Sequence, residues 1–184
     1  EGDASYGGAD ASDNSGSLTY VRIEYPGIAF VPGNEINGLT CGGVGSSTVL
    51  DHIMVSRSGD DAFEFFGGTV NGKYLIAHNT YDDDFDTDFG FQGKIQFGLV
   101  KRDPNFADVS GSNGFESDND ATGSTNSPQT NPTFSNMTVV GPIQNAGDVI
   151  NVNYKRGAHL RRNTNTDIFN SVIIGYPSGI MVDG

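Results

Sequence analysis

The stretch GDDAFEFFGG at residues 59–68 recurs in altered form as DDDFDTDFG at residues 82–90 and as SNGFESDND at residues 112–120. In each copy a phenylalanine is followed by an acidic residue, and the next two residues continue the alternation of side chains between two faces. This pattern is typical of a β-strand with one buried face. Glycine, aspartate and asparagine surround the copies, and these residues favour turns. The three copies therefore predict equivalent short strands that begin and end at tight turns.

Further strands of this kind are predicted along the whole chain. We align them at residues 39–41, 63–66, 85–88, 115–118, 160–163 and 180–183. The first position of each strand is apolar and is expected to face inward, as a column of Leu39, Phe63, Phe85, Phe115, Leu160 and Ile180. The next position is expected to face outward and reads Thr40, Glu64, Asp86, Glu116, Arg161 and Met181. In this alignment Arg161 is predicted to face Glu116.

A second set of strands alternates with the first. It is predicted at residues 20–25, 52–57, 73–78, 96–101, 136–142 and 171–177. The apolar pairs expected at equivalent positions are Val21/Ile23, Ile53/Val55, Tyr74/Ile76, Phe97/Leu99, Met137/Val139 and Val172/Ile174. The closest of these pairs lie about 21 to 23 residues apart, which is typical of solenoid coils with loops inserted at their turns.

Two strands per coil and six coils in register predict an all-β fold, a right-handed parallel β-helix. The main alternative is a β-sandwich, which would use antiparallel hairpins with Asn-Gly or Asp-Gly turns at regular spacing, a pattern that is weak here. The 184 residues suit one domain, expected at residues 17–184. Residues 1–16 are expected to be a polar extension or the end of a preceding coil, in a chain excised from a longer protein.

Charge and composition restrict the partners. Asp and Glu outnumber Lys and Arg by 23 to 10, a net charge of −13, which argues against binding to nucleic acid or to an anionic membrane. No apolar run approaches the roughly 18 residues of a membrane span, so no membrane insertion is expected. Few Cys and Lys residues with abundant Asn, Asp, Gly, Ser and Thr favour a secreted or outer cell-surface protein, expected to be a monomer. The single cysteine, Cys41, excludes an internal disulfide framework.

Acidic residues concentrate in the three copies of the opening motif, because 14 of the 23 lie between residues 51 and 120. Parallel coils stack about 4.8 Å apart, and two unit charges at this separation repel by roughly 3 kcal/mol at a dielectric constant of 20. Calcium, which prefers several oxygen ligands, would relieve this repulsion. The predicted calcium ligands are Asp60, Asp61, Asp83, Asp84, Asp86, Glu116 and Asp118. The alternative is a solvated acidic face without an ion.

Enzymatic chemistry is the second hypothesis for this region. A polysaccharide lyase would need a cationic base, for which Lys101 and Arg102 are the candidates. A glycoside hydrolase would need two close carboxylates, for which Asp86 and Glu116 are the candidates. Contacts to a polymer are predicted for Arg57, Phe66, His78, Tyr81 and Asp88. Salt bridges between the cationic residues and neighbouring acids are the alternative for Arg57, His78 and Lys101.

A resemblance to a known family is carried by SLTYVRIEY, DDAFEFFGGTVNGKYLIA, DDDFDTDFGFQGKIQFGLV, GSNGFESDND and IFNSVIIGYP. These segments resemble the pectin-lyase-like right-handed β-helix surface proteins of Bacteroidota. The resemblance implies the β-helix fold and a secreted or surface-anchored protein that extends beyond both ends of this chain. It implies no particular reaction, because such folds occur in lyases, hydrolases, esterases and adhesins.

The function expected from the sequence is a calcium-stabilised β-helix module that binds polysaccharide or another surface polymer. The first alternative is a calcium-dependent polysaccharide lyase or glycoside hydrolase. The second is a structural spacer of an adhesin, in which the acidic residues matter only for folding.

Overall fold

Every regular element of the chain is a β-strand in the computed structural model, which describes residues 5–28 and 36–184. The strands form a nine-stranded sheet and a six-stranded sheet. The nine-stranded sheet contains β1 (Ser17–Glu24), β3 (Val49–Ser56), β5 (Asn71–His78), β7 (Lys94–Gln96), β8 (Leu99–Lys101), β10 (Thr133–Ser135), β11 (Thr138–Val140), β13 (Asp167–Phe169) and β14 (Val172–Ile174). The six-stranded sheet contains β2 (Leu39–Gly42), β4 (Phe63–Phe66), β6 (Phe85–Asp88), β9 (Phe115–Ser117), β12 (Arg156–Leu160) and β15 (Ser178–Val182).

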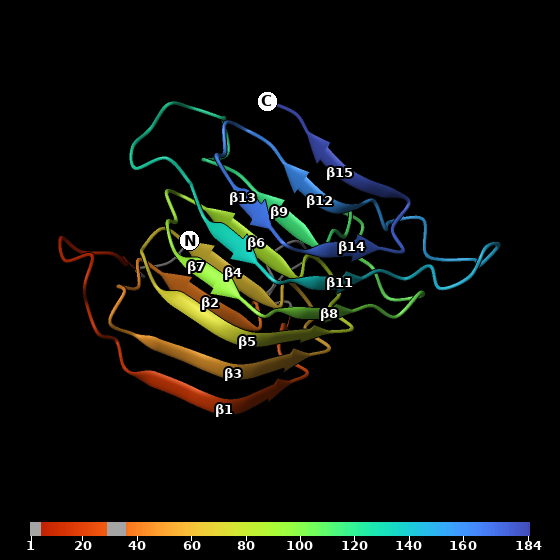
Figure 1. Cartoon of the computed structure of the whole chain (residues 1–184), viewed down its shortest axis with the longest axis horizontal. Coiled ribbons are helices and arrows are strands. Elements are labelled where there is room, and N and C mark those ends of the chain that lie inside the picture. The colour runs from red at the N-terminus through yellow and green to blue at the C-terminus, as the bar shows by residue number, and fades with distance from the viewer. Residues whose placement is uncertain (1–4, 29–35) are drawn as a thin grey trace.

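All strand pairings among these residues are parallel. Figure 1 shows the chain rising coil by coil from β1 to β15, with the strands of one sheet lying over one another. Each coil visits both sheets before the next coil begins. The fold is therefore a right-handed parallel β-helix, as predicted, and the sandwich alternative is wrong.

The nine-stranded sheet bends along a column of residues with positive φ. In β1, β3 and β5 these residues are Tyr20, His52 and Tyr74, with φ of 57°, 53° and 57°. In later coils the same bend interrupts the strand, at Phe97 between β7 and β8 and at Asn136 between β10 and β11. The aromatic rings of the first four coils stack at centroid distances of 4.5, 4.4 and 5.1 Å. This ring column was not predicted, because nothing in the apolar alternation marks one residue as a bend.

The core is built around the inward column of the six-stranded sheet. Leu39, Phe63, Phe85 and Phe115 pair in register, as predicted. The ring of Phe85 stacks on the rings of Phe63 and Phe115 at 5.2 and 5.7 Å. All three phenylalanine side chains are fully buried. This column sets the register of the outward residues beside it, which form the candidate site.

The predicted register of the fifth coil is wrong by two residues. Ala158, rather than Leu160, pairs with Phe115 on one side and with Ile180 on the other. Leu160 lies two residues further along β12, where it pairs with Ser117. Its side chain also faces inward and packs against the core. A long insertion precedes this coil, so the spacing of earlier coils does not fix its register. The inward position is occupied by a small alanine, and apolarity alone favoured the larger Leu160.

Three of the predicted pairs in the nine-stranded sheet face outward. The inward residues of these coils are Leu75 and Ala77, Val100, and Ile173. The predicted members instead lie on the outer face, half-exposed to solvent: Tyr74, Ile76, Phe97, Leu99, Val172 and Ile174. Apolar residues occupy both faces of these strands, so the alternation fits either parity and the wrong one was chosen.

The described part of the predicted N-terminal extension, residues 5–16, contains no strand and runs beside the turn that follows β2. The Ser46 amide donates to the Ala11 carbonyl at 3.0 Å, and the Val49 amide donates to the Gly16 carbonyl at 3.0 Å. Residues 1–4 lie outside the described residues. The segment thus covers one corner of the first coil, close to the ends of β2 and β4.

Candidate functional site

The turns that lead into β4, β6 and β9 lie over one another and bring their acidic residues together. The Asp83 amide donates to Asp61 Oδ1 at 2.8 Å, and the Asn113 amide donates to Asp83 Oδ1. Each buried aspartate therefore holds the backbone of the next turn. On the strands themselves, Glu64, Asp86 and Glu116 pair in register on the outer face. The carboxylates of the turns and of the strands thus occupy one continuous region.

Seven carboxylates in this region form what we call the acidic cluster. They are Asp60, Asp61, Glu64, Asp82, Asp83, Asp86 and Glu116. They make three overlapping groups, Asp60–Asp61–Asp82, Asp61–Glu64–Asp86 and Asp83–Asp86–Glu116, and within each group the ligand atoms lie within 4.8 Å of one another. Such groups provide several oxygen atoms around a single point, which is the arrangement that a hard divalent cation needs.

Burial and mutual repulsion make several carboxyl groups of the cluster weak acids. Burial raises the pKa of Glu64 to about 8, with the negative charges of Asp60 and Asp88 adding to the shift. Burial likewise raises the pKa of Asp61, Asp83 and Asp86 well above the usual aspartate value, and neighbouring carboxylates raise it further. The folded state therefore disfavours the ionised form of these carboxyl groups when no cation is bound.

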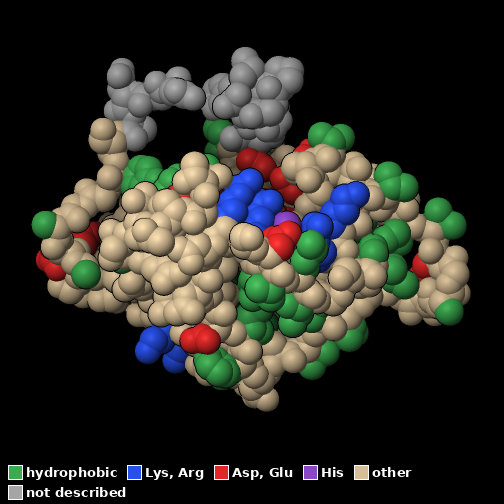
Figure 2. Space-filling view, turned by 90° about the horizontal axis from the view of Figure 1, so that it is seen from above, with side chains coloured by type: hydrophobic (Ala, Val, Ile, Leu, Met, Phe, Trp, Pro, Cys, Tyr) green, Lys and Arg blue, Asp and Glu red, His purple; other side chains and the backbone are tan. Residues whose placement is uncertain are grey.

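Arginines neutralise only one end of the cluster. Arg161 forms ion pairs with Glu116 and, at 2.8 Å, with Asp118, and Arg162 binds Asp118 at 2.9 Å. The predicted contact between Arg161 and Glu116 is confirmed, although His159 is the residue in register with Glu116. Figure 2 shows such a gathering of Lys or Arg side chains beside a histidine and acidic side chains on the face seen from above. In the described ranges, no lysine or arginine forms an ion pair with Asp61, Glu64, Asp83 or Asp86.

Two predicted calcium ligands lie outside the three groups. Asp118 is held by the two arginines, and Asp84 is fully buried with its Oδ2 atom 2.8 Å from Arg102 Nε. The other five predicted ligands are Asp60, Asp61, Asp83, Asp86 and Glu116, and the structure brings them together. Glu64 and Asp82 were missed. The alignment already placed Glu64 beside Asp86, so this residue could have been found from the sequence.

The catalytic candidates are spread over two separate places. Arg102 is 1% exposed, and its guanidinium group is bonded to Asp84 and to three backbone carbonyl groups, so it does not project into a groove as a base would. Lys101 lies on the nine-stranded sheet, in register with His78. Asp86 and Glu116 do stand side by side on the six-stranded sheet. Burial raises the pKa of Glu116 to about 7, although Arg161 opposes this shift.

The predicted polymer contacts are also divided. Ser56, rather than Arg57, is in register with His78, so Arg57 and His78 do not occupy equivalent positions in adjacent coils. The Tyr81 ring packs on Phe106 at 4.7 Å, which leaves it little freedom to act as a platform. Phe66 and Asp88, by contrast, lie side by side in register on the outer face, at the end of β4 and β6. These two residues border the acidic cluster.

Comparison with known proteins gives one finding about the whole chain. A family model described as a pectate-lyase like beta helix domain matches residues 1–184. The chain belongs to this family. No curated protein and no solved structure matches this pectate-lyase-like domain. In residues 5–28 and 36–184 of the domain, no helix has the length and hydropathy required to cross a membrane.

The raised pKa values make the stability of the metal-free domain depend on pH. Folded Glu64 and Glu116 have pKa values of about 8 and 7, against 4.5 for the ordinary side chain. The folded state therefore binds protons more tightly than the unfolded chain, and stability is lost as pH rises through these values. We expect the melting temperature in a chelator to fall by several degrees between pH 5 and pH 8, as measured by circular dichroism.

The variant Glu64→Gln provides the comparison for this pH prediction. Of the two glutamates, Glu64 has the more strongly raised pKa. Its replacement should therefore make the decline of the melting temperature with pH shallower. A melting temperature that stays constant or rises between pH 5 and pH 8 would contradict the prediction. Carboxyl groups with lowered pKa, such as that of Asp148, act at more acidic pH and do not interfere in this window.

Proposed function

We propose that the domain is a calcium-stabilised β-helix module of a secreted or cell-surface protein that binds a polysaccharide or another surface polymer. The observation that carries the calcium part is the set of three overlapping groups of oxygen ligands, four of whose carboxylates lack an opposing lysine or arginine in the described chain. An ion bound by these groups would reduce the repulsion between adjacent coils.

The residues present fit calcium better than a transition metal. All donors of the three groups are carboxylate oxygens, and calcium accepts six to eight oxygen ligands in flexible geometry. Asn113 adds a further oxygen at this place, because its side chain is 1% exposed and its Oδ1 atom has no hydrogen-bond partner among the residues described. Its Nδ2 atom lies 3.3 Å from Glu116 Oε2, which places the amide group beside the cluster.

The polymer part of the proposal is supported by the shape and chemistry of the outer face. Stacked parallel coils present the same strand position again and again along the axis, which suits an extended, repetitive ligand. Phe66 and Asp88 combine an apolar ring and a carboxylate at the border of the acidic cluster. Membership in a pectate-lyase-like family is in keeping with a role that involves polysaccharide.

Calcium is expected to raise the melting temperature of the domain. An ion that binds only the folded state stabilises it by mass action, and at about 100 times Kd the melting temperature should rise by roughly 5 to 10 °C. A chelator should reverse this rise, and sodium at equal ionic strength should not reproduce it. The measurement is thermal unfolding by circular dichroism in chelator, in calcium and in sodium.

A pair of variants on one strand separates specific binding from general screening. Asp86→Asn removes a charge that two of the three groups share, so it should raise stability in chelator and weaken the response to calcium. Asp88→Asn makes the same change two residues further along β6, outside the three groups, and should leave the calcium response intact. An identical response to calcium in both variants, or no response in the wild-type domain, would refute the calcium site.

A further inference from the structure

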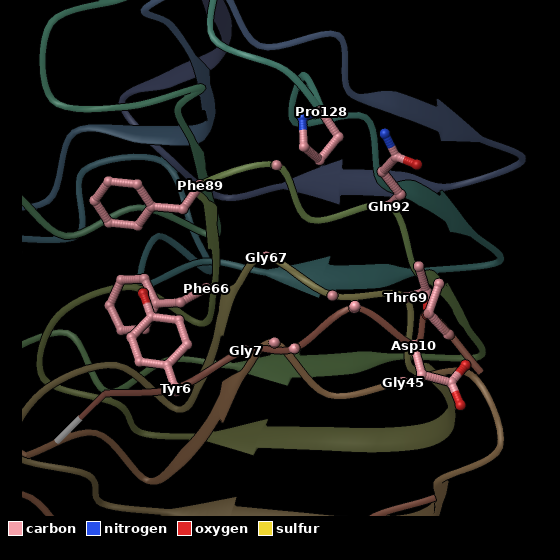
Figure 3. A pocket seen from close by; sticks show the side chains of 16 residues that line it. Tyr6, Gly7, Asp10, Gly45, Phe66, Gly67, Thr69, Phe89, Gln92 and Pro128 are labelled. Carbon is pink, nitrogen blue, oxygen red and sulfur yellow. The ribbon is translucent and has the colours of Figure 1, made fainter. Parts of the chain in front are cut away.

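A hollow of about 360 Å³ lies where the six-stranded sheet ends and the chain turns towards the nine-stranded sheet. We call it the trough and define it by the side chains that the argument uses: Tyr6, Asp10, Phe66, Thr69, Phe89 and Gln92. Figure 3 shows the three aromatic rings on one side of the trough and Asp10, Thr69 and Gln92 on the other, with glycine backbone between them. The trough thus has an apolar end and a polar end.

The apolar end is a curved wall of three rings. Phe66 lies between Tyr6 and Phe89, at centroid distances of 6.2 and 5.7 Å, with its ring tilted by 34° and 43° to theirs. Tyr6 is 56% exposed and Phe89 is 50% exposed. The wall therefore offers ring surface to a ligand.

Phe89 has a positive φ, a backbone conformation that glycine adopts at the equivalent position of the two preceding coils. Its φ is 51°, and the residues at the same place in the two preceding coils are Gly67 and Gly43, with φ of 65° and 61°. A side chain in this left-handed region costs about 1 kcal/mol or more. Packing does not compensate for this cost, because the ring is half-exposed. The same conformation occurs at the bend of the nine-stranded sheet, at Tyr20, His52, Tyr74 and Phe97.

The polar end presents groups that can bind hydroxyls. Both hydrogen bonds to the Asp10 carboxylate come from Ser12 and reach Oδ1, and they lower the pKa of this group, so it is ionised at neutral pH. Its Oδ2 atom accepts no hydrogen bond from the described residues. The Gln92 side chain has one weak contact, from Nε2 to the Gln129 carbonyl at 3.4 Å. Both side chains are exposed, so the Asp10 Oδ2 atom and the Gln92 amide group can contact a ligand.

Glycines line the trough between its two ends. A Cβ on Gly68 would lie 2.5 Å from the Val44 carbonyl oxygen, and one on Gly90 would lie 2.4 Å from the Pro128 carbonyl oxygen. The close approach of neighbouring backbone therefore requires glycine at these two positions. A Cβ on Gly8 would meet nothing within 4 Å, so packing does not demand a glycine there. The absence of a side chain at this position leaves backbone groups accessible from the trough.

We propose that the trough binds a neutral sugar unit of the polysaccharide, an inference that rests on the proposed polymer-binding function. The apolar C–H face of a sugar ring packs on aromatic rings, while its hydroxyls donate to a carboxylate and exchange hydrogen bonds with an amide. The described residues that line the trough include Asp10 but no lysine or arginine, and Asp88 lies beside Phe89. A uronic acid would be repelled here, so the ligand is a neutral hexose or pentose.

The test is a titration of the full chain with defined oligosaccharides, first in the presence of a chelator and then in the presence of calcium. The probes are oligomers of glucose, mannose, xylose and galacturonic acid, and binding is measured by calorimetry and by saturation-transfer NMR. At least one neutral oligomer should bind, and the galacturonic acid oligomer should not bind at the trough. Phe89→Ala and Asp10→Asn should each weaken neutral binding roughly tenfold, which corresponds to about 1.4 kcal/mol.

Tyr74→Ala is the matched control, because Tyr74 is a half-exposed ring on the other sheet and lies outside the trough. This variant should bind as the wild-type chain does. Asp10 is exposed and lies in no strand, so Asp10→Asn keeps the test valid even if Phe89→Ala disturbs folding. Glycan binding that the trough variants leave unchanged would overturn the trough site alone. Failure of every oligomer to bind, with and without calcium, would overturn the polymer-binding function as well.

Discussion

Replacing Arg102 with methionine is expected to lower the free energy of unfolding by about 3 to 5 kcal/mol. The guanidinium group is fully buried, with Nε 2.8 Å from Asp84 Oδ2 and Nη1 2.6 Å from the Thr80 carbonyl oxygen. It also donates to the carbonyl groups of Asp82 and Asn113. One side chain therefore joins the turn before β6 to the turn before β9. Its loss would remove the donor of three carbonyl groups and the counter-charge of Asp84, which would keep the Tyr176 hydroxyl at 3.3 Å.

The reason for this large effect can be tested by a double variant. Burial raises the pKa of Asp84 to about 6 even though Arg102 opposes the shift, so the unpaired carboxyl group should be costly. Adding Asp84→Leu to Arg102→Met should restore part of the lost stability, because the orphaned charge is removed. Arg22→Met is the control, since its ion pair with Glu24 is exposed and contributes about 0–1 kcal/mol. A loss below about 1 kcal/mol for Arg102→Met in urea unfolding would contradict this account.

The six-stranded sheet could be predicted well because only one of its faces is apolar. Phe63, Phe85 and Phe115 alternate with Glu64, Asp86 and Glu116, so period and parity are both unambiguous. The nine-stranded sheet has apolar residues on both faces, and there the same reasoning chose Tyr74 where Leu75 is buried. Hydrophobic alternation thus identifies a strand reliably, but it identifies the buried face only where the opposite face is polar.

The stacking of the aligned coils predicted which carboxylates lie together. It did not predict which arginines pair with Asp84 and Asp118. Once the coils are aligned, Asp61, Asp83 and Asp86 must lie close together, and they do. Asp84 and Asp118 belong to the same runs of sequence, yet arginines from other coils hold them. Arg102 reaches Asp84 from the end of β8, and no spacing rule shows that its side chain turns inward. Long-range pairing of this kind depends on side-chain direction, which the alignment does not contain.

Truncating Phe85 to alanine is expected to cost about 3 to 5 kcal/mol, because the cavity would open in the middle of the core column. The ring is fully buried and lies 5.2 Å from Phe63, 5.7 Å from Phe115 and 5.8 Å from Phe134. The melting temperature should fall by roughly 10 °C.

Phe89→Ala, four residues further along, removes a ring of the same size from a half-exposed position and should cost about 1 kcal/mol or less. Phe85→Leu keeps much of the buried volume and should fall between the two alanine variants. If Phe85→Ala and Phe89→Ala have equal melting temperatures, the stacked phenylalanines are not what holds successive coils together. The stability of the domain would then have to come from the hydrogen-bonded turns that carry Asp61, Asp83 and Arg102. In that case Arg102→Met would lower the melting temperature more than Phe85→Ala does.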